Sequence, residues 1–258
     1  MTDPSPQLLI DAELFTENPE EAIAYYEWLL GVRFPDFSNP EFAPAHLPPA
    51  GAEPGWVPRF LVPSVDAAIT AVQPLGAHRR DTEPAWGGKH YAVSDDGLWA
   101  GITEHVSHGV PNITANVDCA THTVERTSRF LQTLLSAEPL DTLEDPYDVR
   151  VIASDRRVAS MVLRMRAEMN VSTRTTWIVY FTAHDIVSTV SRANESGSRV
   201  LVPPVSSPFD RYAILRDPWG QMFGLSDPFD ESARDGVLLR DASGRTAPAT
   251  DFIDLHVE

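Results

Sequence analysis

Apolar and polar residues recur along the chain in a pattern that predicts short strands separated by helices. Residues 8–15, LLIDAELF, alternate poorly but are apolar enough for a strand. Residues 18–31, NPEEAIAYYEWLLG, place an apolar stripe on one side of a helix. Asn18 suits the N-cap, Pro19 the first helical position and Gly31 the position after the end. The chain is therefore expected to start with a strand followed by a helix.

Later segments predict more elements of the same kind. In chain order, they are a helix starting after Ser64 and ending at Gly76, strands at 149–153 and 158–165 joined by a tight turn at Asp155–Arg157, a strand at 177–182, a helix capped by Asp185 and ending near Gly197, and a hairpin of 212–215 with 222–226. The Asp-Pro-Trp-Gly sequence at 217–220 predicts the turn of that hairpin.

The chain also repeats itself. Residues 56–80 match residues 177–201 at an offset of 121 (177 − 56), which aligns Trp56 with Trp177. The same offset aligns Tyr91 with Tyr212. Two residues are then missing from the first copy, after which Gly101 aligns with Gly224. One segment has been duplicated.

Two segments depart from the repeat. The stretch between Phe34 and Trp56 carries six prolines, so it is expected to be a loop in place of regular strands. Residues 227–250 are also loop-like. Residues 251–258, DFIDLHVE, alternate apolar and polar side chains and predict a late strand added to the edge of a sheet.

Composition narrows the class of protein. The 258 residues carry a net charge of −17, from 20 Lys and Arg against 37 Asp and Glu, which disfavours nucleic acid as a partner. Cys119 is the only cysteine, so no intramolecular disulfide is possible. No signal-peptide pattern and no apolar run near ~20 residues is present. A cytoplasmic protein with no membrane partner is expected.

The order of strands and helices, ending in YA…DPWGQMFGL, resembles the vicinal oxygen chelate superfamily. That group includes glyoxalase I, bleomycin-resistance proteins, extradiol dioxygenases and fosfomycin-resistance enzymes. More narrowly, the chain looks like tandem two-module actinobacterial proteins labelled glyoxalase/bleomycin resistance protein/dioxygenase. The resemblance covers about residues 8–228. It implies an α+β fold in which two tandem βαβββ modules, residues 1–107 and 108–230, form a barrel-like mixed sheet around a central cavity, with 231–258 as a C-terminal extension.

The resemblance also indicates where a metal would lie. Family ligands come from the first strand of a module (His or Gln) and from its last strand (Glu). The last-strand position matches Gly101 and Gly224, which cannot ligate, and no His occupies Asp11–Glu13 or Asn116–Asp118. No metal of the family type, and no other cofactor, is therefore expected. The two glycines either leave a pocket wall open or serve backbone packing.

Three side chains are candidates for acid–base chemistry. Asp11 and Glu13 lie two residues apart on one face of a strand, where each carboxylate raises the pKa of the other. The alternative is that they bind arginine. His184 precedes a helix cap and is a candidate general base, since imidazole commonly serves in that role; the alternative is an exposed loop histidine.

A second group of residues is expected to line the cavity and bind the ligand. Its apolar and aromatic members are Trp56, Trp99, Trp177, Tyr180, Tyr212 and Met222, for which ordinary core packing is the alternative. Its remaining members are Arg59, His90, Asn116, Asp118, Arg211 and Gly224.

Two classes of function remain open. One is a protein that sequesters a bulky, partly aromatic metabolite, as the resemblance to bleomycin-resistance proteins implies. The other is an enzyme: either a metal-independent biosynthetic catalyst using Asp11, Glu13 or His184, or a metal-dependent lyase or dioxygenase with relocated ligands. The expected partner is a small molecule, and the expected state a monomer or homodimer.

Overall fold

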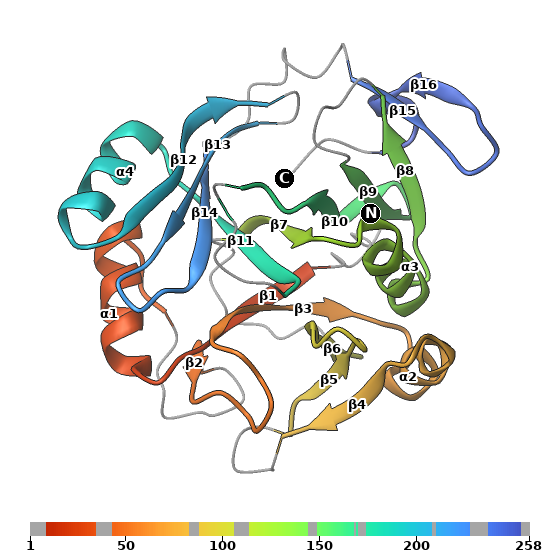
Figure 1. The fold of residues 1–258 in the computed structure, drawn as a ribbon, viewed down its shortest axis with the longest axis horizontal. Coiled ribbons are helices and arrows are strands. Elements are labelled where there is room, and N and C mark those ends of the chain that lie inside the picture. Colours follow the sequence, from red (N-terminus) through yellow and green to blue (C-terminus); the bar gives the residue numbers. More distant parts are fainter. Residues whose placement is uncertain are drawn as a thin grey trace, which may run out of the picture.

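Two mixed β-sheets, each built from one half of the chain, pack against each other with helices at both sides (Figure 1). This computed structural model describes residues 9–34, 43–82, 88–105, 114–143, 149–167, 169, 174–207, 210–227 and 237–253. Within these ranges no helix has the length and apolar character needed to cross a membrane. The α+β class predicted from the sequence is confirmed.

The first half forms a six-stranded sheet in the order β2-β1-β3-β6-β5-β4. Its elements are β1 (Leu9–Phe15), α1 (Pro19–Leu30), β2 (Ala45–His46), β3 (Gly55–Leu61), α2 (Val65–Val72), η1 (Gln73–Leu75), β4 (His78–Asp81), β5 (His90–Val93) and β6 (Trp99–Thr103). The predicted caps of the first helix are correct, since Asn18 is the N-cap residue and Gly31 ends the helix at φ 69°.

The second half forms a ten-stranded sheet in the order β12-β13-β14-β11-β7-β10-β9-β8-β15-β16. Its elements are β7 (Thr114–Thr121), α3 (Val124–Leu135), β8 (Glu138–Thr142), β9 (Arg150–Ser154), β10 (Arg157–Arg164), β11 (Thr176–Thr182), α4 (Ile186–Glu195), β12 (Arg199–Ser206), β13 (Arg211–Arg216), β14 (Met222–Ser226), β15 (Leu238–Arg240), β16 (Thr246–Pro248) and η4 (Ala249–Asp251). The predicted turn between β9 and β10 is present, with positive φ at Asp155 and Arg156.

The unit of repetition is larger than a single module. The second half contains two strand–helix–strand units, β7-α3-β8-β9-β10 and β11-α4-β12-β13-β14, joined by antiparallel pairing of β7 with β11. The first half joins β1 to β3 in the same way. The expected single barrel-like sheet shared by the two halves is therefore wrong. The described strands form two separate sheets and no closed barrel.

The proline-rich segment explains why the first sheet is smaller. Where the second half places β8, β9 and β10, the described part of the first half has only the two-residue strand β2. Proline removes the amide donor that a central strand needs. The prediction that residues between Phe34 and Trp56 lack regular strands is thus correct for the described residues 43–54, apart from β2.

One large core fills the space between the sheets. Alternate residues of β11, namely Trp177, Val179 and Phe181, join it, while the residues between them face the opposite way. All four α-helices add apolar side chains, α2 packs on α3, and β3 packs on β11. Trp56 and Trp177, which were expected to line a cavity, are both buried in this core. We call the sheet faces turned away from it the outer faces.

The C-terminal part extends the edge of the second sheet. Strand β15 pairs with β8, and Leu239 of this strand, together with Val237 and Ile253 beside it, packs against the outer face of β9. Of the strand predicted at 251–258, the described residues 251–253 are not in a strand, since η4 ends at Asp251; residues 254–258 lie outside the described part of the chain.

Candidate functional site

The two outer faces carry the same framework of positions with different chemistry. Register pairing aligns Arg59 with Asp11 and Gly101 in the first sheet, and Tyr180 with Asn116 and Gly224 in the second. Six pairs of positions correspond in this way: Asp11 and Asn116, Glu13 and Asp118, Arg59 and Tyr180, Tyr91 and Tyr212, Trp99 and Met222, Gly101 and Gly224. Comparing the two halves shows on which outer face the buried carboxylates have hydrogen-bond and ion-pair partners.

In the first half, both carboxylates are bound by cations. Arg59 donates to Asp11 through Nε at 2.9 Å and through Nη2. The Lys89 ammonium donates to Glu13 Oε2 at 2.7 Å, and the Tyr91 hydroxyl donates to Glu13 Oε1 at 2.7 Å. Burial would raise the pKa of Glu13, but Lys89 and then His46 outweigh it and lower that pKa below its usual range. Glu13 is therefore held ionised and fully bonded, an arrangement that does not favour proton transfer.

Aromatic rings cover the rest of this face. Trp99 packs edge-on against Phe15 and Tyr91, with centroid distances of 6.0 and 5.4 Å. All three are buried in one small cluster. The first outer face thus consists of ion pairs, in which both carboxylates have partners, and interlocked rings, among which Trp99 Nε1 has no hydrogen-bond partner in the described part of the chain.

In the second half, polar atoms at the equivalent positions lack hydrogen-bond partners among the described residues. Asp118 is 7% exposed, and burial raises its pKa to about 8 despite the opposing effects of a hydrogen bond with Tyr180 and the charge of Arg166. The Oδ1 atoms of Asp118 and Asn116 are buried and have no hydrogen-bond partner among the described residues. Buried polar atoms of this kind are rare and need an explanation. A carboxyl that is neutral at pH 7 is a candidate functional group.

The surroundings of Asp118 are mostly apolar. The cluster on this outer face consists of Ala120, Leu163, Met165, Met169, Ile178, Tyr180, Leu201, Val202, Ile214 and Met222, with Val149 and Tyr212 at its margin. Arg166 Nη2 donates to the Tyr212 hydroxyl at 3.2 Å, and the Tyr180 and Tyr212 rings meet edge-on. Apolar side chains with a few convergent polar groups are typical of small-molecule sites. We call Asn116, Asp118, Arg166, Tyr180 and Tyr212 the second-sheet site.

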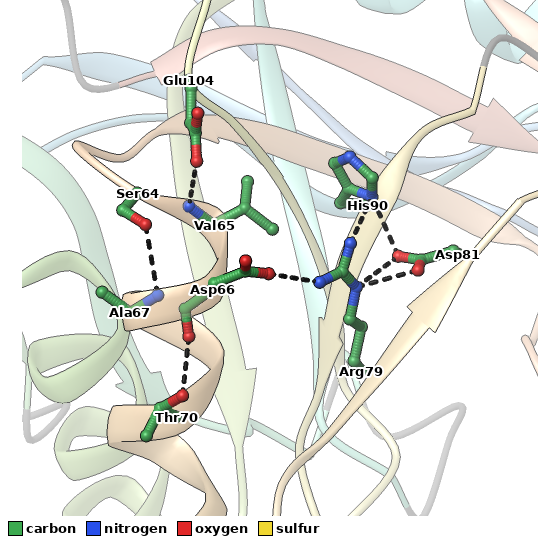
Figure 2. A network of polar contacts seen from close by, with 9 residues as sticks. All are labelled: Ser64, Val65, Asp66, Ala67, Thr70, Arg79, Asp81, His90 and Glu104. Atoms are coloured by element: carbon green, nitrogen blue, oxygen red, sulfur yellow. Dashed lines mark hydrogen bonds and ion pairs between the residues drawn. The ribbon is translucent and has the colours of Figure 1, made fainter.

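The other predicted site residues lie elsewhere. His184 is exposed in the loop before α4, as its alternative interpretation expected. Arg211 is exposed and lies 3.7 Å from a carboxylate oxygen of Asp227. His90, on the outermost strand pair of the first sheet, contacts Asp81 at 2.9 Å and Arg79 at 3.2 Å in an exposed network (Figure 2). None of these three belongs to the second-sheet site.

Figure 2 also shows that Glu104 has a structural partner. Its Oε1 accepts from the amide of Val65 at 2.7 Å, at the start of α2, where Ser64 accepts from the amide of Ala67 at 3.3 Å. A carboxylate at a helix N-terminus is favourable. Glu104 therefore caps a helix.

The residues present do not fit a metal of the family type. The positions that meet on β7, β11 and β14 hold Asp118, Tyr180 and Gly224, of which one is a carboxyl and one has no side chain. On the first sheet, Arg59 and Lys89 already neutralise the carboxylates. The described residues contain no group of three or more His, Cys, Asp or Glu that could hold a metal ion.

Sequence reasoning missed four residues that shape the two faces: His46, Lys89, Tyr91 and Arg166. Tyr91 had a signal, since the repeat aligns it with Tyr212. Lys89 had another, because it is the only lysine in the chain. His46 and Arg166 come from irregular or very short segments and carried no signal.

Comparisons with known proteins agree with this fold. The model of the Glyoxalase/Bleomycin resistance protein/Dioxygenase superfamily matches residues 9–225. An anthracycline biosynthesis protein, DauV, of Streptomyces sp. (strain C5) is 29% identical over 168 residues, which are 62% of this chain and 56% of that protein; the match thus spans little more than half of the relative.

Solved structures resemble the chain over most of its length. The 2,2',3-trihydroxybiphenyl 1,2-dioxygenase of Sphingomonas wittichii strain RW1 is 12% identical with a TM-score of 0.60, covering 86% of this chain and 90% of that one. The Mn(II)-bound glyoxalase of Novosphingobium aromaticivorans is 13% identical with a TM-score of 0.61, covering 98% and 95%. At these identities the likeness shows a shared fold.

Proposed function

Because this chain belongs to the Glyoxalase/Bleomycin resistance protein/Dioxygenase superfamily, we propose that it binds a bulky, partly aromatic small molecule at the second-sheet site. The observation that carries the proposal is the pair of buried Oδ1 atoms on Asn116 and Asp118 that have no partner in the described part of the chain. Hydroxyl groups of a ligand would satisfy both atoms. The apolar cluster around them would cover its rings.

The resemblance to an anthracycline biosynthesis protein supports natural-product biosynthesis as the setting. The match covers only part of that relative, so its activity as a whole is not carried over. What it supports is the class of ligand, a product or intermediate of a biosynthetic pathway. Sequestration of such a compound remains the second candidate.

The state of Asp118 favours an enzyme over a sequestering protein. A carboxyl with a pKa of about 8 carries its proton at neutral pH and can pass it to a ligand oxygen. Tyr180 forms a hydrogen bond with Asp118, the Tyr212 ring packs on Tyr180, and Arg166 donates to the Tyr212 hydroxyl, so this group of side chains would orient ligand oxygens. We therefore assign the acid–base role to Asp118, rather than to Asp11 or Glu13, whose carboxylates are held in ion pairs.

We further propose that the protein works without a metal of the family type. This rests on the residues at the ligand positions, which are Tyr180 and Gly224 beside a single buried carboxyl. A metal-dependent lyase or dioxygenase with relocated ligands is the alternative. No group of candidate ligands in the described ranges supports it.

Substitution of Asp118 by Asn tests the proposal. Asn keeps the shape of the protonated carboxyl but cannot transfer a proton. A panel of hydroxylated polycyclic aromatic compounds would be titrated by intrinsic fluorescence and incubated for product detection by mass spectrometry. We expect binding by the wild type, and turnover that Asp118→Asn abolishes while its cooperative unfolding transition shows that the variant is folded.

The exposed Asp66→Asn makes the same chemical change away from the site and should bind and react like the wild type. Equal binding and turnover of every compound by Asp118→Asn and the wild type would refute the site. One tightly held transition metal per purified chain would refute metal independence.

A further inference from the structure

A separate cavity of about 600 Å³ lies where the two halves meet. The first half contributes the end of η1 and the turn between β5 and β6, and the second half contributes the start of α3 and residues of β9 and β10. Its lining consists of Leu75, Ser94, Asp95, His122, Thr123, Val124, Glu125, Arg126, Arg129, Phe130, Arg150 and Arg164. This volume is in the range of small-molecule sites. No residue of the second-sheet site is among them.

The lining is strongly cationic in a strongly acidic protein. Four arginines converge on it, although the chain as a whole has a net charge of −17. Two acidic residues, Asp95 and Glu125, accompany them. The four arginines and two carboxylates leave the lining with a net charge of +2, before any charge on His122. A local reversal of sign of this kind attracts anions.

Ion pairs use only part of this positive charge. Arg126 pairs with Asp95 across the two halves. Arg150 donates to Glu125 at 2.6 Å and to Asp141 at 2.7 Å. The guanidinium of Arg129 makes no ion pair or hydrogen bond with any described residue, so its five donors face the cavity and solvent. Guanidinium groups bind phosphate in a planar, bidentate manner.

Arg164 reaches this cavity from the opposite side of β10 to the second-sheet site. On β10, Val162 belongs to the core between the sheets and Leu163 belongs to the outer face. Residues alternate between faces along a strand, which places Arg164 on the side of Val162. The cavity is therefore distinct from the second-sheet site in position as well as in chemistry.

The start of α3 adds backbone donors to the same lining. Thr123, the N-cap residue, makes no side-chain capping bond, whereas Asp185 caps α4 through the amide of Ser188. His122 to Arg126 all line the cavity. The amides of the first turn are thus available to an acceptor oxygen, in addition to the arginines.

From the cavity and its arginines together, we propose that the junction between the halves binds a phosphorylated small molecule. Its phosphate group would lie between Arg129 and the first turn of α3, and its remainder would contact Leu75 and Phe130. Because the lining comes from both halves, the bound anion would hold them together.

Calorimetric titration of the whole protein with inorganic pyrophosphate, at constant ionic strength, tests this proposal. We expect saturable binding with one site per chain and a rise in melting temperature. Arg129→Gln should weaken binding by about tenfold or more, since hydrogen bonds between charged groups are lost. Arg80→Gln removes the same charge from an exposed strand of the first half and should leave binding unchanged.

Three results would overturn the proposal. One is the absence of saturable pyrophosphate binding to the wild type. Another is an equal loss in Arg129→Gln and Arg80→Gln, which would indicate attraction by overall charge alone. The third is equal affinity for citrate, which would assign the site to carboxylates in place of phosphates. Arg129 is exposed, so Arg129→Gln should fold, and its melting temperature without ligand verifies this.

Discussion

The ring of Tyr180 lies directly against the backbone of Gly224, its register partner on β14. A Cβ atom at position 224 would stand 2.2 Å from Cδ1 and 2.4 Å from Cε1 of the ring. Side chains do not approach this closely. The glycine is therefore required by the packing of the tyrosine, which decides between the two interpretations that the sequence left open.

Gly224→Ala should consequently destabilise the protein. Overpacking of a filled site typically costs about 1–3 kcal/mol. The free energy of unfolding, measured by urea denaturation without ligand, should fall by that order. Gly101→Ala is the matched variant of the first half: its Cβ would lie 3.2 Å from Cβ of Arg59, so a smaller loss is expected.

A double variant isolates the cause. If the ring of Tyr180 is what the new methyl group meets, Tyr180→Ala should remove most of the cost of Gly224→Ala when the two changes are combined. Simple additivity of the two losses would contradict the packing explanation. So would unchanged stability of Gly224→Ala on its own.

Asp118→Asn should change how stability depends on pH. The pKa of Asp118 is about 8 in the folded protein, above its unfolded value, so the folded state holds a proton that the unfolded state has lost. Stability of the wild type therefore falls as pH rises between about 4 and 8. The Asn variant lacks this contribution to the free energy of unfolding, and its advantage over the wild type should grow across that range, by at most about 1.4 kcal/mol per pH unit.

Thermal denaturation at several pH values measures this difference. Asp66→Asn, an exposed change of the same kind, should show no such growing advantage. A difference between Asp118→Asn and wild type that stays constant from pH 5 to pH 8 would show that Asp118 is ionised throughout.

Glu13→Gln should lower the free energy of unfolding, because Glu13 is ionised in the folded protein whereas Asp118 is neutral. Lys89 and Glu13 have side chains that are each 5% exposed, so loss of the carboxylate leaves a buried ammonium unpaired. Breaking a buried pair typically costs about 3–5 kcal/mol. The pKa of Glu13 is lowered in the folded state, so its contribution is present above pH ~4 and is lost as pH falls through the folded pKa.

The double variant Glu13→Gln with Lys89→Met provides the control. It removes the stranded charge, and much of the stability lost in Glu13→Gln should return. Equal stability of the single and double variants would show that the ammonium finds other partners. Urea denaturation at pH 7 compares the three proteins.

Much of the local structure follows from the sequence. Alternation places Asp11 with Glu13, and Asn116 with Asp118, on one side of their strands, and the structure puts them there. Turn chemistry correctly locates the β9–β10 turn at Asp155. What the pattern cannot supply is the pairing of strands, because β1 with β3 and β7 with β11 are contacts between distant segments.

The candidate site likewise combines features that the sequence predicts with contacts between distant segments that it does not predict. The repeat and the alternation within each strand predict that Tyr180, Tyr212 and Met222 lie on one face, because the direction of a side chain along a strand depends on the local sequence. The difference between the halves depends on partners that sequence does not place. Lys89 reaches Glu13 across 76 residues, and Arg166 meets Tyr212 across 46. Those contacts hold Glu13 ionised, while burial leaves Asp118 neutral.

A last prediction concerns the contact between α1 and the Asp-Pro-Trp-Gly turn. The Tyr26 hydroxyl donates to Asp217 Oδ2 at 3.0 Å and accepts from Trp56 Nε1 at 3.1 Å, so it links the first half to the turn before β14. Burial raises the pKa of Asp217 to about 6, although backbone amides and Tyr26 oppose the shift. This chain of bonds joins the halves inside the core.

Tyr26→Phe should destabilise the protein in a pH-dependent way. It leaves the Trp56 Nε1 donor unsatisfied at every pH, a loss of about 1–3 kcal/mol. It also removes a donor from ionised Asp217, which raises the pKa of that carboxyl further. The wild type itself loses stability as pH rises from about 4 to 6, because the folded state keeps the Asp217 proton longer. The deficit of Tyr26→Phe should therefore be larger at pH 7.5 than at pH 5. Tyr25→Phe, which breaks the bond of 2.5 Å to the buried Ser198, should show a deficit independent of pH. Denaturation of the three proteins at both pH values decides the matter, and a deficit of Tyr26→Phe that does not change between them would mean that Asp217 does not depend on the tyrosine.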